Sequence, residues 1–190
     1  EYLLAILTIE SHLNQCIVIG EDLGVVPPEV KTALADKAIF SNGLFYFEKD
    51  FHGEFLTAQS FPAQSLLMVA NHDVPPFFGW WQGFDLTLKH EYQLLDEQQL
   101  GQLQTERKIE KQRLLRFLSS CETHSFSLDS PAEDVYQAVT LGLAHAPARL
   151  FTIQLDDLDE QILPVNIPGT DQEYPNWRRV LSHSSEHILA

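Results

Sequence analysis

Short apolar runs alternate with helix-type patterns along the chain. The runs cover residues 16–20, 43–47, 65–70 and 149–155. They are too short for helices, and β-branched or aromatic side chains are frequent in them, so each predicts a buried strand. Strands that alternate with helices are typical of a parallel α/β sheet.

Helices are predicted between and around these strands. Leu3, Ile6 and Leu7 share one face of a helix over residues 1 to about 13. Paired prolines mark the start of a second helix, which runs from Pro27-Pro28 to about Lys37. Leucines among charged residues predict two or three helices between 85 and about 119, and the final residues, 182–190, predict a short last helix.

The segment Ser130-Pro131-Ala132-Glu133 has the sequence of a capping box. Val135, Val139 and Leu143 follow at a spacing of four residues and predict a buried stripe. By contrast, the aromatic-rich residues that follow Pro75-Pro76 include Gly79 and are expected to form an irregular loop before the helices that begin at Asp85.

Four parallel strands in 190 residues predict about half of a (β/α)8 barrel, because a complete barrel needs roughly 250 residues. We therefore expect residues 1–190 to be the C-terminal part of a catalytic barrel, with a helical insertion at about 85–148. The chain starts without Met and enters a helix without a polar cap, so it is expected to be cut from a longer protein.

Composition narrows the classes of partner. Lys and Arg number 12 against 27 Asp and Glu, which gives a net charge of −15, so nucleic acid and anionic membranes are poor partners. No apolar run approaches the roughly 20 residues of a membrane span. Cys16 and Cys121 form no disulfide framework or metal spacing, which agrees with a cytoplasmic location.

We expect no cofactor and no metal site. His183 and His187 have the spacing of a helical metal pair, but a third ligand is absent nearby, so a solvated tail helix is favoured. The acidic residues 156–160 could ligate a cation, although a solvated loop is the simpler interpretation.

Carboxylates follow two of the predicted strands. Glu21 and Asp22 come directly after residues 16–20, and Asp73 follows 65–70. The carboxyl ends of parallel strands meet at one edge of a sheet, where active sites form. Two carboxylates in a shared cleft could perform glycoside chemistry. Alternatively, Glu21 or Asp22 caps the following helix or pairs with a lysine.

Three motifs in order resemble those of one family. They are Ile19-Gly20-Glu21-Asp22-Leu23-Gly24-Val25-Val26-Pro27, then His72-Asp73-Val74-Pro75 with Gly79-Trp80-Trp81, and finally Pro164-Val165-Asn166-Ile167-Pro168-Gly169-Thr170 through Asn176-Trp177-Arg178-Arg179. The chain resembles the 4-alpha-glucanotransferases, also called amylomaltases or disproportionating enzymes, over residues 17–181. Three motifs in the same order are far more specific than one.

The resemblance implies roles for individual residues. Glu21 would be the general acid/base, Asp73 would stabilise the transition state, and His72 would hydrogen-bond the sugar. Asp22 is expected to orient the loop or cap the helix. The family nucleophile is an aspartate on the preceding barrel strand, and no such strand precedes Glu21, so this chain is expected to be inactive alone.

The resemblance also implies α-1,4-glucans as donor and acceptor, with transfer between maltooligosaccharides by retaining double displacement in maltose and glycogen metabolism. Trp80 and Trp81 would stack on acceptor rings, unless they belong to the core. Further candidate contacts with substrate are Asn166, Gly169, Asn176 and Trp177.

The sequence departs from the motif pattern near Asp73. Asn71 stands where the family usually has threonine, and Pro76 and Phe78 stand where close relatives have threonine and arginine. We therefore expect some contacts on the acceptor side to differ.

Two other interpretations remain open. One is a glucan hydrolase on the same barrel, and the other is a noncatalytic glucan-binding or interaction domain. Independently of the function, the exposed sheet edges of a half barrel could lead to self-association.

Overall fold

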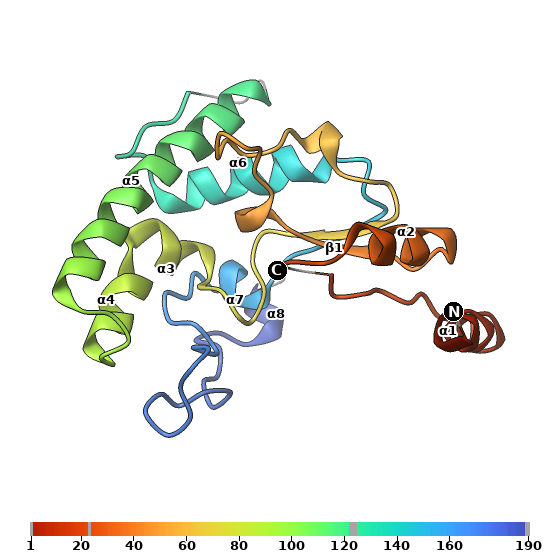
Figure 1. Cartoon of the computed structure of the whole chain (residues 1–190). Helices are drawn as coiled ribbons and strands as arrows, with labels where there is room; N and C mark the ends of the chain where they lie inside the picture. Colours follow the sequence, from red (N-terminus) through yellow and green to blue (C-terminus); the bar gives the residue numbers. More distant parts are fainter. Residues whose placement is uncertain (1, 23, 122–124, 189–190) are drawn as a thin grey trace.

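A parallel sheet runs through the middle of the computed structural model (Figure 1). The structure describes residues 2–22, 24–121 and 125–188, and within them the sheet has three strands in the order β1-β2-β3: β1 (Ser41–Leu44), β2 (Ser65–Met68) and β3 (Leu150–Thr152). Ser41 is paired with Ser65 and Leu66 with Leu150. Neighbouring strands are thus consecutive in sequence and parallel, as in the wall of a (β/α)8 barrel.

Helices surround this sheet. They are α1 (Tyr2–Leu13), α2 (Pro28–Asp36), α3 (Phe77–Gln82), α4 (Phe84–Glu91), α5 (Glu97–Ser120), α6 (Ala132–Ala144), α7 (Leu155–Leu158) and α8 (Ser185–Ile188), with short 3-10 turns η1 (Phe45–Phe47) and η2 (Ala58–Ser60). α2 packs against β1, and α6 packs against α5, α3 and η2. Figure 1 shows α1 at the periphery, apart from the sheet.

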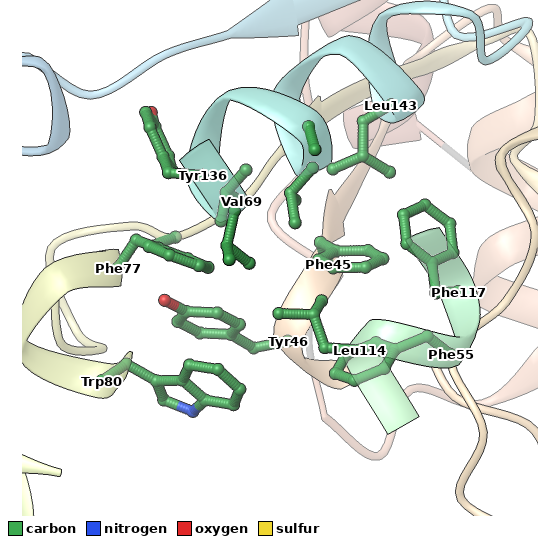
Figure 2. Close-up of a cluster of buried hydrophobic side chains, with 14 of the residues drawn as sticks. Phe45, Tyr46, Phe55, Val69, Phe77, Trp80, Leu114, Phe117, Tyr136 and Leu143 are labelled. Carbon is green, nitrogen blue, oxygen red and sulfur yellow. The ribbon is translucent and has the colours of Figure 1, made fainter. Parts of the chain in front are cut away.

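The core lies between the strand ends and the helices α3, α5 and α6. Figure 2 shows their side chains pointing toward one another, with Phe45 stacked on Phe55 at a ring distance of 4.7 Å. The stripe predicted on α6 is confirmed, because Val135, Val139 and Leu143 are all buried. Removing so much apolar surface from water is the main stabilising contribution to this part of the fold.

The largest difference between the predicted and the observed sheet lies at the first predicted strand. Residues 16–20 contribute one parallel bridge, Ile19 to Phe40, instead of a full strand, and Cys16, Ile17 and Ile19 are exposed. The prediction of a strand buried on both faces is therefore wrong here. In the described part of the chain, this segment lies at the edge of the sheet, where Val18 and Gly20 exchange backbone hydrogen bonds with Phe40, the residue before β1.

Three local predictions also need correction. The aromatic residues at 45–47 form the turn η1 and end β1 earlier than expected, and residues 77–82 form the helix α3 instead of a loop. The capping box does not form at α6, because the hydroxyl of Ser130 accepts a hydrogen bond from the backbone N–H of Ser127. The expected C-terminal helix is confirmed as the short α8, and residues 189–190 of that prediction lie outside the described residues.

Candidate functional site

Asp73 is positioned by the turn that follows β2. The side-chain oxygen of Asn71 accepts a hydrogen bond from the backbone N–H of Asp73 at 3.0 Å. An asparagine that bonds the backbone two residues later forms a local turn, which fixes the direction of the chain. Asn71 serves here to hold the backbone at Asp73.

The carboxylate of Asp73 lies between two polar side chains. Asn166 donates its amide N–H to Oδ1 at 2.9 Å, and Nε2 of His72 lies 3.5 Å from Oδ2. The Asp73 side chain is still 47% exposed, so the carboxylate is accessible to a ligand. Two residues from one loop and one from another are thus brought together at this point.

Trp177 adds an aromatic surface to this group. Its ring lies 5.2 Å from the ring of His72, and 62% of the residue is exposed. Its backbone has φ +61°, a left-handed conformation that is an outlier for a bulky residue and costs about 1–3 kcal/mol. An exposed indole beside a carboxylate, an amide and an imidazole combines an apolar platform with groups that hydrogen-bond hydroxyls, which suits a sugar.

The loop that carries Asn166 and Trp177 rests on a small apolar cluster of its own. Leu88 of α4, Ile167 and Tyr174 are buried together. The Tyr174 ring meets Tyr92 edge to face at 5.6 Å, and its hydroxyl donates to the carbonyl of Pro164. This cluster anchors the loop to α4 beneath the candidate site.

Glu21 lies apart from the loops around Asp73, in the segment between Ile19 and α2. It is exposed and follows the bridge between Ile19 and Phe40, so β1 separates its segment from β2. Asp22 is buried, and its carboxylate accepts a hydrogen bond from the backbone N–H of Asn42 at 2.8 Å. Asp22 therefore ties the loop of Glu21 to β1, which agrees with the predicted orienting role.

Among the described residues, no hydrogen bond or ion pair joins Glu21 to the group around Asp73. Glu21 follows the bridged residue Ile19, and Asp73 follows β2. The strand β1 lies between these two segments in the sheet. Each carboxylate lies beyond the carboxyl end of its own segment of the sheet.

Trp80 and Trp81 belong to the core. They are 4% and 5% exposed, and Trp80 stacks on Tyr46 at 5.1 Å while Trp81 stacks on Phe77 at 5.9 Å. A sugar could not reach either ring without opening this core, so the predicted stacking on an acceptor is corrected in favour of the core interpretation. Phe78, one of the departures from the family pattern, is buried with them.

Gly169 and Asn176 shape the loop of the site. Gly169 is exposed and has φ +91°, a conformation that favours glycine in turns. The side-chain amide of Asn176 bonds Ile167 and Thr170 of the same loop. Neither residue offers a free side-chain group to a substrate.

The acidic segment after β3 was not predicted correctly. Asp157 is 2% exposed and Asp159 is also buried, so this is not a solvated loop. Asp157 accepts a hydrogen bond from the backbone N–H of Phe77 at 2.6 Å, and burial raises its pKa to about 7. Asp159 binds the backbone N–H of Ser182 and Nδ1 of His183, both at 2.6 Å.

These acids, which lie in and at the end of α7, fasten α3 and the C-terminal segment to that helix, a role that the sequence did not indicate. The available signal was three aspartates within five residues directly after the apolar run 149–155. His183 is likewise occupied by Asp159, and its ring stacks on His187 at 4.7 Å. In the part of the chain that the structure describes, no cluster of three His, Cys, Asp or Glu residues could hold a metal ion.

None of the helices built from described residues is both long enough and apolar enough to cross a lipid bilayer. In the described residues, parallel strands alternate with helices, and polar groups gather beyond the strand ends. That combination defines a segment of a (β/α)8 barrel with a candidate carbohydrate site.

Comparison with known proteins identifies the family. Residues 1–184 match the 4-alpha-glucanotransferase family, glycoside hydrolase family 77, and the chain belongs to it. The resemblance stated from the three motifs is confirmed.

Individual relatives agree with this assignment. A 4-alpha-glucanotransferase of Haemophilus influenzae is 35% identical over 99% of this chain, and one of Mycobacterium tuberculosis is 28% identical over 93% of it. The crystal structure of amylomaltase from Corynebacterium glutamicum superposes with a TM-score of 0.88 at 25% identity, over 95% of this chain. The predicted barrel fold is thereby confirmed.

The chain spans a minor part of these relatives. It covers 28% of the length of the Haemophilus protein, 25% of the Mycobacterium protein and 27% of the Corynebacterium chain.

Proposed function

We propose that this chain supplies the acid/base and a transition-state carboxylate to a 4-alpha-glucanotransferase. The substrates would be α-1,4-glucans, with segments moved between maltooligosaccharides. The observation that carries the proposal is the half-exposed Asp73, held by Asn166 and flanked by His72 and Trp177, in a chain that belongs to this family.

Glu21 has the chemistry of the general acid/base. In a retaining double displacement it would protonate the glycosidic oxygen as a nucleophilic carboxylate attacks the anomeric carbon. It would then take the proton from the 4-hydroxyl of the incoming glucan. Its exposed position beyond Ile19 leaves the carboxylate open to a substrate, and Asp22 fixes its loop.

Asp73 would act by binding sugar hydroxyls more strongly in the distorted transition state than in the ground state, which is the condition for a contact to accelerate the reaction. Asn166 and His72 hold its carboxylate for this task, and Trp177 provides a face on which a sugar ring stacks. We propose that the nucleophile is supplied from outside these 190 residues.

The central test is Glu21→Gln in the full-length protein, assayed by disproportionation of maltotriose. Loss of the transferable proton should lower the transfer rate by roughly 10²–10⁴-fold or more. Glu29→Gln, another exposed glutamate at the start of α2, is the matched control and should retain activity. Near-normal transfer by the Glu21 variant would refute the acid/base assignment.

Two further measurements separate the alternatives. Redistribution of chain lengths with little net hydrolysis identifies a transferase, while hydrolysis without redistribution identifies a glucan hydrolase. The 190-residue chain should show no disproportionation, and measurable transfer would contradict a nucleophile outside it. A cytoplasmic location, which we also propose, agrees with two free cysteines, Cys16 and Cys121.

A further inference from the structure

The side-chain amide of Asn176 is fully occupied within its own loop. Its Oδ1 accepts from the backbone N–H of Ile167 at 2.9 Å. Its Nδ2 donates to the carbonyl of Thr170 at 3.1 Å and to the Thr170 hydroxyl at 2.8 Å. That hydroxyl in turn donates to the carbonyl of Ile167 at 2.8 Å.

These bonds join the two ends of the loop that borders Asp73. The backbone N–H of Trp177 adds a bond to the carbonyl of Val165 at 2.9 Å. We call the set formed by Val165, Ile167, Thr170, Asn176 and Trp177 the loop clamp. Asn166, which bonds Asp73, lies between two of its members, and Trp177 is one of them.

We propose that Asn176 is a positioning residue, which holds Asn166 against Asp73 and Trp177 against His72 so that both face the glucan. The inference rests on the proposed glucan site. It replaces the expectation that Asn176 contacts substrate, because every polar hydrogen and the oxygen of its amide already have partners in the loop.

Two features of the loop require such a device. No helix or strand covers residues 159–184, so backbone ladders do not fix this part of the chain. In addition, Trp177 is held at φ +61°, which a tryptophan adopts only when the surroundings impose it. The apolar cluster of Leu88, Ile167 and Tyr174 holds the loop against α4. The loop clamp, by contrast, fixes the backbone on both sides of Asn166 and at Trp177.

The decisive variant is Asn176→Asp. It keeps the size of the side chain and the oxygen that accepts from Ile167, but it puts an acceptor where Nδ2 donates to the Thr170 carbonyl. Positioning therefore predicts that Asn176→Asp is at least as harmful as Asn176→Ala. Thr170→Val should give the same defect, while Thr170→Ser keeps the hydroxyl and should retain most of the function.

The control is Gln172→Ala in the same loop. Gln172 is exposed, and its side chain bonds only the neighbouring Asp171 among the described residues. This variant should behave as the parent protein in every measurement.

The first measurement is made without ligand. The full-length protein is labelled with 5-fluorotryptophan, and the ¹⁹F signal of Trp177 is assigned with Trp177→Phe. Both Asn176 variants should shift that signal toward the position of a free, mobile indole, and Gln172→Ala should not. If Asn176 instead touches substrate directly, the signal stays in place.

The second measurement is binding of maltotriose in a Glu21→Gln background, which prevents turnover. Both Asn176 variants should raise Kd about tenfold, the effect of losing one good interaction. A shifted ¹⁹F signal with an unchanged Kd would show a purely structural role and overturn the proposal, as would wild-type behaviour of Asn176→Asp in both measurements.

These results also separate this proposal from the function on which it rests. If the parent protein binds no maltotriose, the glucan site itself is refuted, and with it the role of Asn176 toward a glucan. The ligand-free spectra would then still show whether Asn176 sets the place of Trp177.

Discussion

Among single residues, Asp157 is the one whose charge conflicts most with its surroundings. Its Oδ1 accepts from Phe77, but within the described part of the chain its buried Oδ2 has no partner. The aromatic hydroxyl of Tyr46 is also buried without a described partner, and the charge of Asp157 contributes to the raised pKa of Tyr46 after burial itself. The ionised form of Asp157 is therefore disfavoured in the folded protein.

Asp157→Asn should increase stability at pH 8 and have a smaller effect at pH 5. Burial raises the pKa of Asp157 from 3.8 to about 7, so between these values the folded state holds a proton that the unfolded state has lost. Stability then falls as pH rises through this window and changes no further above it. Asparagine removes this cost, and its side-chain oxygen can still accept from Phe77.

The urea midpoints of parent and variant are measured at pH 5 and at pH 8. The difference between variant and parent at pH 5 is then compared with the same difference at pH 8. Taking the difference removes the titration of other groups. Since the site is nearly dry, the gain at pH 8 should be of the order of a few kcal/mol at most. An equal difference at pH 5 and pH 8 would contradict the assigned titration.

The placement of candidate site residues could be predicted from sequence where their position along a strand decides it. His72 and Asp73 lie four and five residues after the end of β2, and the strand was recognisable from its apolar run. Trp80 and Trp81 could not be assigned the same way, because a dense aromatic group fits a core and a sugar platform equally well. Which of the two it is depends on α5, a later segment of the chain, whose Arg107 and Lys111 lie over the rings of Trp80 and Trp81 at 4.9 Å and 4.6 Å.

For the helices and strands, α3 shows how local composition can mislead. Pro75, Pro76 and Gly79 suggested a loop, yet the prolines precede the helix, where proline is tolerated, and Gly83 ends it with φ +75°. Gly79 lies inside the helix for a tertiary reason. A Cβ at this position would overlap the backbone carbonyl of Ile162.

Gly79→Ala should therefore destabilise the protein, although alanine is the better helix former. Overlap with backbone cannot be relieved by a rotamer change, so we expect a loss of about 1–3 kcal/mol. Gly101→Ala in α5 is the matched control, because the space around that glycine is open. There the helix propensity acts alone and should add about 1 kcal/mol.

Urea unfolding of both variants measures these free energies. The two substitutions are chemically identical and both lie within helices, so opposite signs isolate the contact with Ile162. If Gly79→Ala were as stabilising as Gly101→Ala, the close approach of α3 to residue 162 would be refuted.

Residues 16–20 were recognised as extended but not correctly placed. An apolar run predicts a preference for burial, and it contains no information on which segment covers it. In the described structure one side of this run pairs with Phe40, and Ile17 and Ile19 remain exposed. The existence of elements thus followed from periodicity, while their burial depended on the partners of each segment.

At the scale of the whole molecule, the order of strands was predictable because each is joined to the next through helical or turn segments and lies parallel to it. Right-handed crossovers between parallel strands leave few other arrangements. The least predictable part was the C-terminal third, where the loop clamp and the buried acids Asp157 and Asp159 hold irregular segments by side-chain hydrogen bonds. Such bonds follow no period, whether they join residues of one loop, as in the loop clamp, or residues as far apart as Asp157 and Phe77.

The exposed apolar surface of α1 leads to a prediction about association. None of the twelve residues of α1, all of them described, is buried, and Leu3, Ile6 and Ile9 are 78%, 55% and 56% exposed. A contiguous apolar face of this kind favours contact with another surface. A net charge of −15 opposes association between copies, and salt screens that repulsion.

The 190-residue chain should consequently self-associate, and more strongly as salt is raised, which light scattering over a range of protein and salt concentrations measures. Leu3→Lys with Ile6→Lys should return the chain to the monomer, because two charges on the face cannot be buried without a cost of several kcal/mol each, roughly. Leu141→Lys removes an exposed leucine from α6 instead and should leave association unchanged. A monomer at every concentration, or equal effects of both substitutions, would show that α1 is not the contact surface.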